Sequence, residues 1–289
     1  MASRQQIKQR IGSVKNTKQI TRAMQLVSAS KLRRAQEAAV GPTAYASLAR
    51  EILTRLRQLA ADESELKLFT ERPVKRRLLI AITSDLGLAG AYDGNVIRRM
   101  LQEVQADRKR GITTSVICIG RKAAQAASHV ADLNVLGAYQ EFPDRPDIDQ
   151  LRPIIASTVG MFANGEADAV DMIFTHFIST VSQQVEAQRL LPAGFQEAEM
   201  SDELARAEIE PSAETLLRAA AMQLLESQVY QAFLDAVASE HSMRMLAMKS
   251  ATDNATDLIE DLTLAFNNAR QAAITQELAE ISAGVEAMK

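Results

Sequence analysis

The sequence has no tryptophan, few aromatic residues and a single cysteine. Aromatic residues make up 4% of the 289 residues, although 47% of the chain is apolar. Alanine, leucine and methionine must therefore supply most of the buried surface, and this composition favours helices that pack on helices. The lone Cys118 excludes an internal disulfide and fits a reducing compartment.

Long apolar runs are also missing. No stretch is long and apolar enough to cross a bilayer, and no secretory signal opens the chain, so we expect a soluble or peripheral protein. The net charge of −3 hides a basic segment in residues 1–40, where Glu37 is the only acidic residue. A cationic helix there could meet nucleic acid or an acidic protein surface. Charge alone leaves both open, although few aromatic residues are present to stack on bases.

Glycine and proline are absent between Pro211 and Gly284. An unbroken helix over this stretch would be on the order of 100 Å long, at 1.5 Å per residue. Apolar residues recur at steps of three and four, as in a helix that packs against another helix. They are Leu225, Val229, Ala232, Ala236, Leu258, Leu262, Ala265, Ala269, Ile274, Leu278, Ile281 and Val285. The pattern predicts a long helix with a helical partner.

The first forty residues show the same pattern. Apolar positions at helical spacing are Ile7, Ile11, Val14, Ile20, Met24, Val27, Leu32, Ala35 and Ala39. Gly41-Pro42 is expected to kink or stop this helix, and a second piece, about residues 43–61, could continue it.

The middle of the chain predicts an α/β domain. Two short apolar runs of the buried-strand type, at 78–82 and 115–119, flank a helix at 94–108 and form a β-α-β unit with parallel strands. A further helix is expected at 147–163, and two strands at 170–179 and 184–191. The predicted fold class is therefore α/β, with a long antiparallel coiled coil of the terminal helices and a Rossmann-like domain inserted between them. The predicted domains are 1–61, 75–195 and 211–289.

This order of elements lets the terminal helices return past each other, and the C-terminal helix then outruns its partner by about fifteen residues, roughly 20 Å. Its tip carries mostly small or apolar residues, such as Ile274 and Leu278. An exposed apolar helix end is costly in water, so the tip predicts a partner protein with a socket.

No group of residues predicts catalysis. Gly87, Gly90 and Gly94 follow the first strand, but their spacing is neither G-x-G-x-x-G nor a P-loop, and a plain turn is favoured over a nucleotide site. The three histidines stand far apart, which disfavours a metal site. Ser84-Asp85 lacks a base placed by any motif.

Both ends of the chain resemble the γ subunit of F-type ATP synthases, the central rotor stalk. The motifs are IKQRIGSVKNTKQITRAM (7–24), SASKLRR (28–34), RMLAMKSATDN (244–254) and ARQAAITQE (269–277), followed by Glu280 and Gly284. In the middle, SDLGLAG (84–90) and FISTVS (177–182) also resemble the family. The sequence departs from the family pattern at Leu86 and Ala89, where arginine and cysteine are common, and at Val285, where alanine is usual.

The resemblance implies a left-handed coiled coil inside a hexamer of three α and three β subunits, with the α/β domain beside the ε subunit and the c-ring. Proton flow would turn the ring and this chain, and the asymmetric shaft would drive each β subunit through its nucleotide states. It implies a non-catalytic subunit with no cofactor of its own, since ATP, ADP and Mg belong to α and β. It also implies a peripheral position on the cytoplasmic side of a bacterial inner membrane.

By motif position, the resemblance assigns contact with β, or coupling of the two helices, to Met24, Arg244, Arg270, Gln271, Thr275, Glu277 and Glu280. Lys31, Arg33 and Arg34 could meet an acidic loop of β. Two other readings are a nucleotide-dependent enzyme with a coiled-coil arm and a nucleic-acid-binding coiled coil. The first requires nucleotide affinity of the isolated chain, and the second requires salt-sensitive binding to DNA or RNA.

Overall fold

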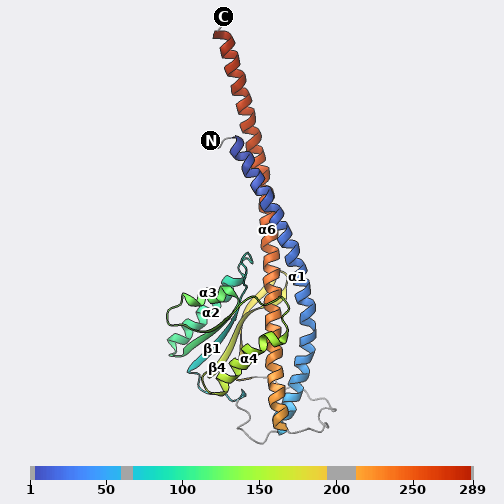
Figure 1. Ribbon diagram of the computed structural model, residues 1–289, viewed down its shortest axis with the longest axis vertical. Helices are drawn as coiled ribbons and strands as arrows, with labels where there is room; N and C mark the ends of the chain where they lie inside the picture. Colours follow the sequence, from blue (N-terminus) through green and yellow to red (C-terminus); the bar gives the residue numbers. More distant parts are fainter. Residues whose placement is uncertain (1–3, 60–67, 194–212, 288–289) are drawn as a thin grey trace. The chain divides into compact units, whose positions relative to one another are not determined.

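Two long helices begin and end the chain, and an α/β domain lies between them in sequence. The structure is a computed structural model that describes residues 4–59, 68–193 and 213–287. Helix α1 runs Arg4–Leu59 and helix α6 runs Ala213–Ala287 (Figure 1). The chain divides into two compact units. One, the shaft unit, holds the described residues up to Ser28 and from Arg244 onward, and the other, the α/β unit, is Ala29–Met243.

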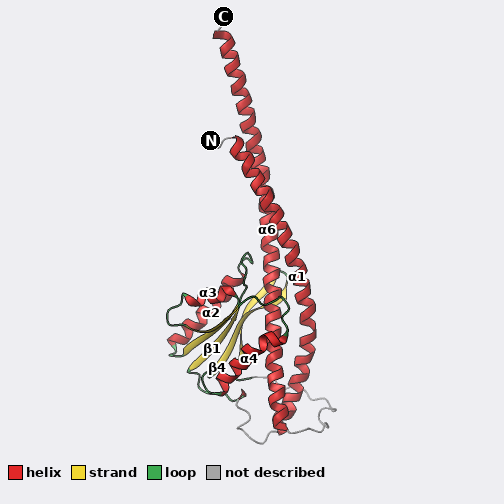
Figure 2. Cartoon of the chain, in the orientation of Figure 1, coloured by secondary structure: helices red, strands yellow, loops and turns green. Residues whose placement is uncertain are grey.

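A five-stranded sheet with the order β3-β2-β1-β4-β5 forms the centre of the α/β unit (Figure 2). The strands are β1 (Arg76–Ile82), β2 (Thr113–Ile119), β3 (Asn134–Tyr139), β4 (Ala169–Ser179) and β5 (Ser182–Leu191). The first four are parallel, and β5 returns antiparallel to β4. The central strands β1, β2 and β4 are almost wholly buried, because helices cover both faces of a parallel sheet.

Helices α2 (Tyr92–Lys109) and α3 (Arg121–Ser128) lie on one face of the sheet, and α4 (Ile148–Ala163) lies on the other (Figure 1). The core under α2 and α3 is built from small and branched side chains. Its members are Leu79, Ala81, Val96, Met100, Val104, Val116, Cys118, Ala123, Ala127 and Ile173. Gly120, at the β2–α3 turn, has φ +96°, and a Cβ there would lie 2.1 Å from the Thr83 carbonyl oxygen. This turn therefore requires glycine.

In the shaft unit, α1 and α6 run antiparallel (Figure 1). A repeating set of less exposed positions on each helix follows steps of four and three, the spacing of a coiled-coil seam. On α1 they are Ile7, Ile11, Val14, Lys18, Thr21, Gln25 and Ser28. On α6 they are Met248, Thr252, Ala255, Ile259, Leu262, Phe266, Ala269 and Ala273.

The predicted fold class is confirmed, and several local expectations were wrong. Residues 120–140, left without elements by the sequence, contain α3 and β3. The helix does not stop at Gly41-Pro42, because α1 continues through both residues to Leu59. Ile20 and Val27 were placed on the apolar stripe but are 60% and 55% exposed, because the seam passes through Thr21 and Ser28 instead. The predicted domain limits at 1, 61, 195, 211 and 289 lie outside the described residues.

Candidate functional site

A hydrogen bond between two threonines joins the helices inside the shaft unit. Thr252 Oγ1 lies 2.8 Å from Thr21 Oγ1 and also 2.8 Å from the Met248 carbonyl oxygen, and both threonines are buried. Thr21 Oγ1 lies 3.1 Å from the Lys18 carbonyl oxygen. Polar groups at seam positions fix the register of a coiled coil at a cost in packing. This part of the seam is therefore held by a specific contact as well as by apolar packing.

The outer face of α1 beside the threonine pair is apolar and exposed. Ile20, Leu26 and Val27 are each more than half exposed, whereas Met24 is half-buried. Exposed apolar side chains that cluster on one surface indicate an interaction surface. Met24 therefore lies between this outer face and the seam of the shaft unit. Arg244, on α6 in the same unit, is buried.

Beyond residue 273 the described side chains of α6 are all exposed, because α6 extends past the N-terminal end of α1 and has no helix beside it there (Figure 1). Ile274, Leu278 and Ile281 are 46%, 60% and 65% exposed. This segment, 274–283, is called the tip below. The predicted interface residues Arg270, Gln271, Thr275, Glu277 and Glu280 lie on or just before the tip, and all are exposed. The tip thus carries apolar anchors together with polar groups available to a partner.

The three predicted basic residues, Lys31, Arg33 and Arg34, have different surroundings. Lys31 Nζ lies 2.9 Å from Asp144 Oδ2, so this lysine has an ion-pair partner in its own chain. The other oxygen of Asp144 lies 2.8 Å from Nε2 of the buried His241. The His241 hydrogen bond, with that of Lys31, holds the pKa of Asp144 well below its usual range, although burial acts in the opposite direction. These three residues join α1, the loop before α4, and α6 within the α/β unit.

Arg33 and Arg34 are both exposed, as a contact with a partner requires. Arg33 pairs with Glu37 one turn along α1, at 2.9 Å. Exposed pairs of this kind contribute little to stability, so the guanidinium group can exchange Glu37 for an acidic partner at small cost.

Sequence reasoning missed the contacts that attach α6 to the β4–β5 hairpin. Ser239 Oγ donates to the Thr175 carbonyl oxygen at 3.1 Å, and Ser242 Oγ donates to that of Thr180 at 2.8 Å. His176 Nδ1 lies 2.6 Å from Asp235 Oδ2. Burial raises the pKa of Asp235, and the His176 hydrogen bond offsets part of that rise. This joint ties the sheet to α6 within the α/β unit.

The glycine-containing loop after β1 is occupied by carboxylates of the chain itself. Asp93 Oδ1 accepts from the Ser84 backbone N–H at 2.9 Å. Asp85 accepts from the backbone N–H groups of Arg121, at 2.8 Å, and Glu141, at 2.7 Å. In a nucleotide-binding Rossmann fold, backbone donors at this edge receive phosphate. Here internal carboxylates take those donors, which disfavours a nucleotide at this edge.

Within residues 4–59, 68–193 and 213–287, no helix is long and apolar enough to cross a membrane. In the same described residues, histidine, cysteine and acidic side chains form no cluster suited to a metal ion.

These features define a class of protein. In one unit two antiparallel helices pair and leave an exposed tip, and in the other a Rossmann-like sheet is joined to α6 by polar contacts. Comparison with known proteins then gives the family. The family described as ATP synthase matches residues 3–288, and the chain belongs to it, as an ATP synthase γ chain.

Two curated relatives are the ATP synthase gamma chains of Stenotrophomonas maltophilia and Xanthomonas campestris. Each is 39% identical over 288 residues, and the match covers 100% of both chains. The γ chain is a non-catalytic subunit, which agrees with the prediction from the sequence motifs.

Solved structures show the same fold. A central stalk/c-ring structure of the Tetrahymena thermophila mitochondrial ATP synthase has a TM-score of 0.62 and 24% identity. That likeness covers 80% of this chain and 99% of the Tetrahymena chain. A chain of the Euglena gracilis enzyme, solved with OSCP, F1 and the c-ring, has a TM-score of 0.65 and 20% identity, covering 98% of this chain and 93% of that one.

Proposed function

We propose that this chain is the rotor of the F1 part of a proton-translocating ATP synthase and transmits torque between the membrane c-ring and the α3β3 hexamer. Membership of the γ chain family supports this role, and so do the fold neighbours, which come from central stalk/c-ring and OSCP/F1/c-ring structures. The shaft unit enters α3β3, while the α/β unit contacts ε and the c-ring.

The exposed tip is the observation that carries the proposal. Full burial of an aliphatic side chain contributes about 1.5–3 kcal/mol, and Ile274, Leu278 and Ile281 leave this stabilisation unused in the isolated chain. A sleeve of α and β subunits would bury them. The Thr21–Thr252 bond would hold the two helices in register while the sleeve exerts force on one of them.

In this proposal the chain binds neither ATP nor Mg, which belong to α and β. The carboxylates that fill the loop after β1 support that division of labour. The bacterial relatives, and the finding that no described helix could cross a membrane, support a peripheral position on the cytoplasmic face of a bacterial inner membrane.

Cysteine labelling tests the burial of the tip. Leu278→Cys should react quickly with a maleimide in the isolated chain and slowly after assembly with α and β. The native Cys118 gives little background, because it is fully buried. Lys109→Cys, at the exposed end of α2, is the matched control and should react in both states. Equal reactivity of Leu278→Cys before and after assembly would contradict a sleeve around the tip.

A further inference from the structure

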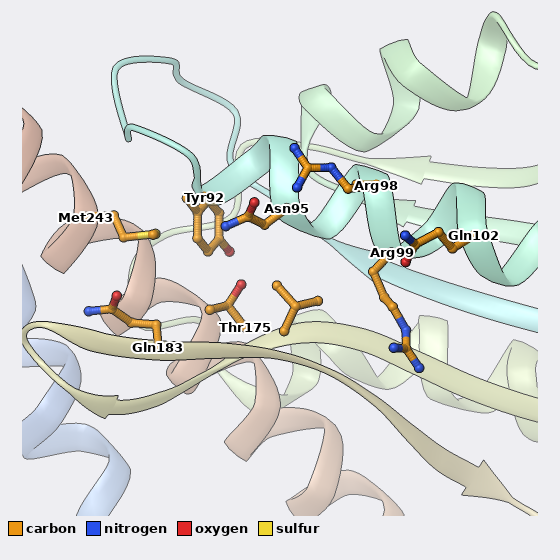
Figure 3. A pocket seen from close by; sticks show the side chains of 9 residues that line it. Tyr92, Asn95, Arg98, Arg99, Gln102, Thr175, Gln183 and Met243 are labelled. Atoms are coloured by element: carbon orange, nitrogen blue, oxygen red, sulfur yellow. The ribbon is translucent and has the colours of Figure 1, made fainter.

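A cavity of about 240 Å³ opens in the α/β unit between α2 and the strands β4 and β5 (Figure 3). Tyr92, at the start of α2, and Met243 of α6 also line it. Asn95, Arg99 and Gln102 of α2 line one wall, and Thr175 of β4 and Gln183 of β5 line the other. The rotor function described above makes no use of this cavity.

Hydrogen-bond donors dominate the α2 wall. Positions 95, 98, 99 and 102 recur at helical spacing and so share one face of α2. Guanidinium groups only donate hydrogen bonds, and each amide offers two donors. In Figure 3 the guanidinium group of Arg99 extends from α2 towards the two strands, and Arg98 extends in the direction of Asn95. The wall is therefore suited to an acceptor.

The positive charge of this wall is only partly neutralised. Arg99 pairs with Glu103 at 2.7 Å, but the same carboxylate also accepts from Arg77 at 2.8 Å. Within the described residues Arg98 has no ion-pair partner, and it is exposed. Arg77 is also paired with Asp107 and Asp171, so Glu103 remains available to Arg99, and the net positive charge at the cavity comes from Arg98.

The opposite wall holds an unsatisfied hydroxyl group. Thr175 is 2% exposed, and its Oγ1 has no hydrogen-bond partner among the residues that the structure describes. Its side chain rises from β4 towards α2, into the cavity (Figure 3). Buried hydroxyl groups are normally paired, so an orphaned one that lines a cavity indicates that the cavity receives a polar ligand.

We propose that this cavity binds an oxyanion of the phosphate class, as inorganic phosphate or as the phosphoryl group of a small metabolite. A tetrahedral oxyanion accepts hydrogen bonds in several directions, so it can bind the α2 donors and the Thr175 hydroxyl at once. A guanidinium group is well suited to phosphate because it presents paired donors and keeps its charge. The volume exceeds that of phosphate alone and leaves room for the rest of a small phosphate ester.

Titration calorimetry of the full chain tests the proposal directly. Inorganic phosphate and glycerol phosphate should each bind saturably with one site per chain, while potassium chloride at matched ionic strength should give no saturable heat. Tighter binding of glycerol phosphate would assign the site to a phosphate ester, and tighter binding of inorganic phosphate would assign it to the free ion. Heat that fails to saturate with either compound would overturn the proposal.

Two variants and a control separate a built site from general electrostatic attraction. Thr175→Val should lower phosphate affinity about tenfold, or about 1.4 kcal/mol, without lowering the midpoint of thermal unfolding, since it removes an unpaired group. The double variant Arg98→Gln/Arg99→Gln should lower affinity more. Arg110→Gln removes one positive charge just after the C-terminal end of α2, outside the cavity, and should leave affinity unchanged. Equal losses in Arg110→Gln and the double variant, or unchanged affinity in Thr175→Val, would refute the site.

Discussion

Replacing Thr252 by valine tests whether the hydrogen bond between Thr21 and Thr252 stabilises the coiled coil or contributes nothing to its stability. Valine has nearly the same shape as threonine, so the packing of the seam is kept and the hydrogen bond to Thr21 is lost. A neutral hydrogen bond contributes a net amount of about 0.5–1.5 kcal/mol. The Thr21 hydroxyl keeps its bond to the Lys18 carbonyl oxygen, so the loss is limited to the bond between the two threonines. We therefore expect Thr252→Val to destabilise this part of the shaft by about 1 kcal/mol.

The reciprocal change and the double variant provide the control. Thr21→Val should cost a similar amount, because it leaves the Thr252 hydroxyl with only the Met248 carbonyl oxygen. In Thr21→Val/Thr252→Val both polar atoms are gone and the seam gains apolar contact. Replacing both partners of a buried hydrogen bond by apolar groups of the same shape is often neutral or stabilising. The double variant should therefore recover most of the loss caused by either single change.

Amide hydrogen exchange is the suitable assay, because it reports opening of the shaft unit separately from the α/β unit. Peptides that cover residues 14–28 and 248–259 should exchange about five times faster in each single variant, which corresponds to about 1 kcal/mol. The double variant should exchange near the native rate. Single variants that exchange at the native rate or more slowly, or a double variant whose loss is the sum of both, would refute the reasoning.

Other parts of the chain give equally definite expectations. Asp144→Ala should destabilise the α/β unit by about 2 kcal/mol in urea unfolding, because the buried His241 loses a carboxylate partner. Lys31→Ala removes a half-exposed ion pair and should cost less than about 1 kcal/mol. Equal costs of the two variants would contradict this ranking. Burial raises the pKa of Cys118 to about 11, so maleimide labelling of the native chain should stay slow at pH 8 and become fast in urea. Arg270→Ala should weaken assembly with α and β or ATP turnover and leave the isolated chain folded, and unchanged assembly and turnover together would count against a contact there.

The fold class could be predicted from the sequence because its clearest patterns span many residues and depend only on residues that are close together in the chain. The stretch without glycine or proline produced α6, and the apolar runs at 78–82 and 115–119 became the buried centre of the sheet. Strand β3 was missed because it lies at the sheet edge, where Val135 and Leu136 remain exposed and no buried pattern is required. Helix α3 is only eight residues long and is rich in alanine, so it carries little periodic signal.

The interface residues were predicted from family motifs and could not be predicted from periodicity. An apolar stripe through Ile20 and Val27 looks as suitable for a seam as the true stripe, and only the partner helix distinguishes the two. The seam instead uses Thr21, whose hydroxyl needs Thr252 more than two hundred residues away in the chain. The same limit applies to Lys31, since its partner Asp144 lies in a loop without any motif.

Single-molecule rotation tests the central claim most directly. The chain carries Lys109→Cys with a bead or gold rod attached, and it is assembled with α and β subunits that are fixed to a surface. We predict that ATP drives the probe in one direction in steps of one third of a turn, since three β subunits act in succession, and that the probe stops when ATP is removed. Continued ATP hydrolysis by the assembled complex while the probe only fluctuates about one angle would show that this chain is not the rotor.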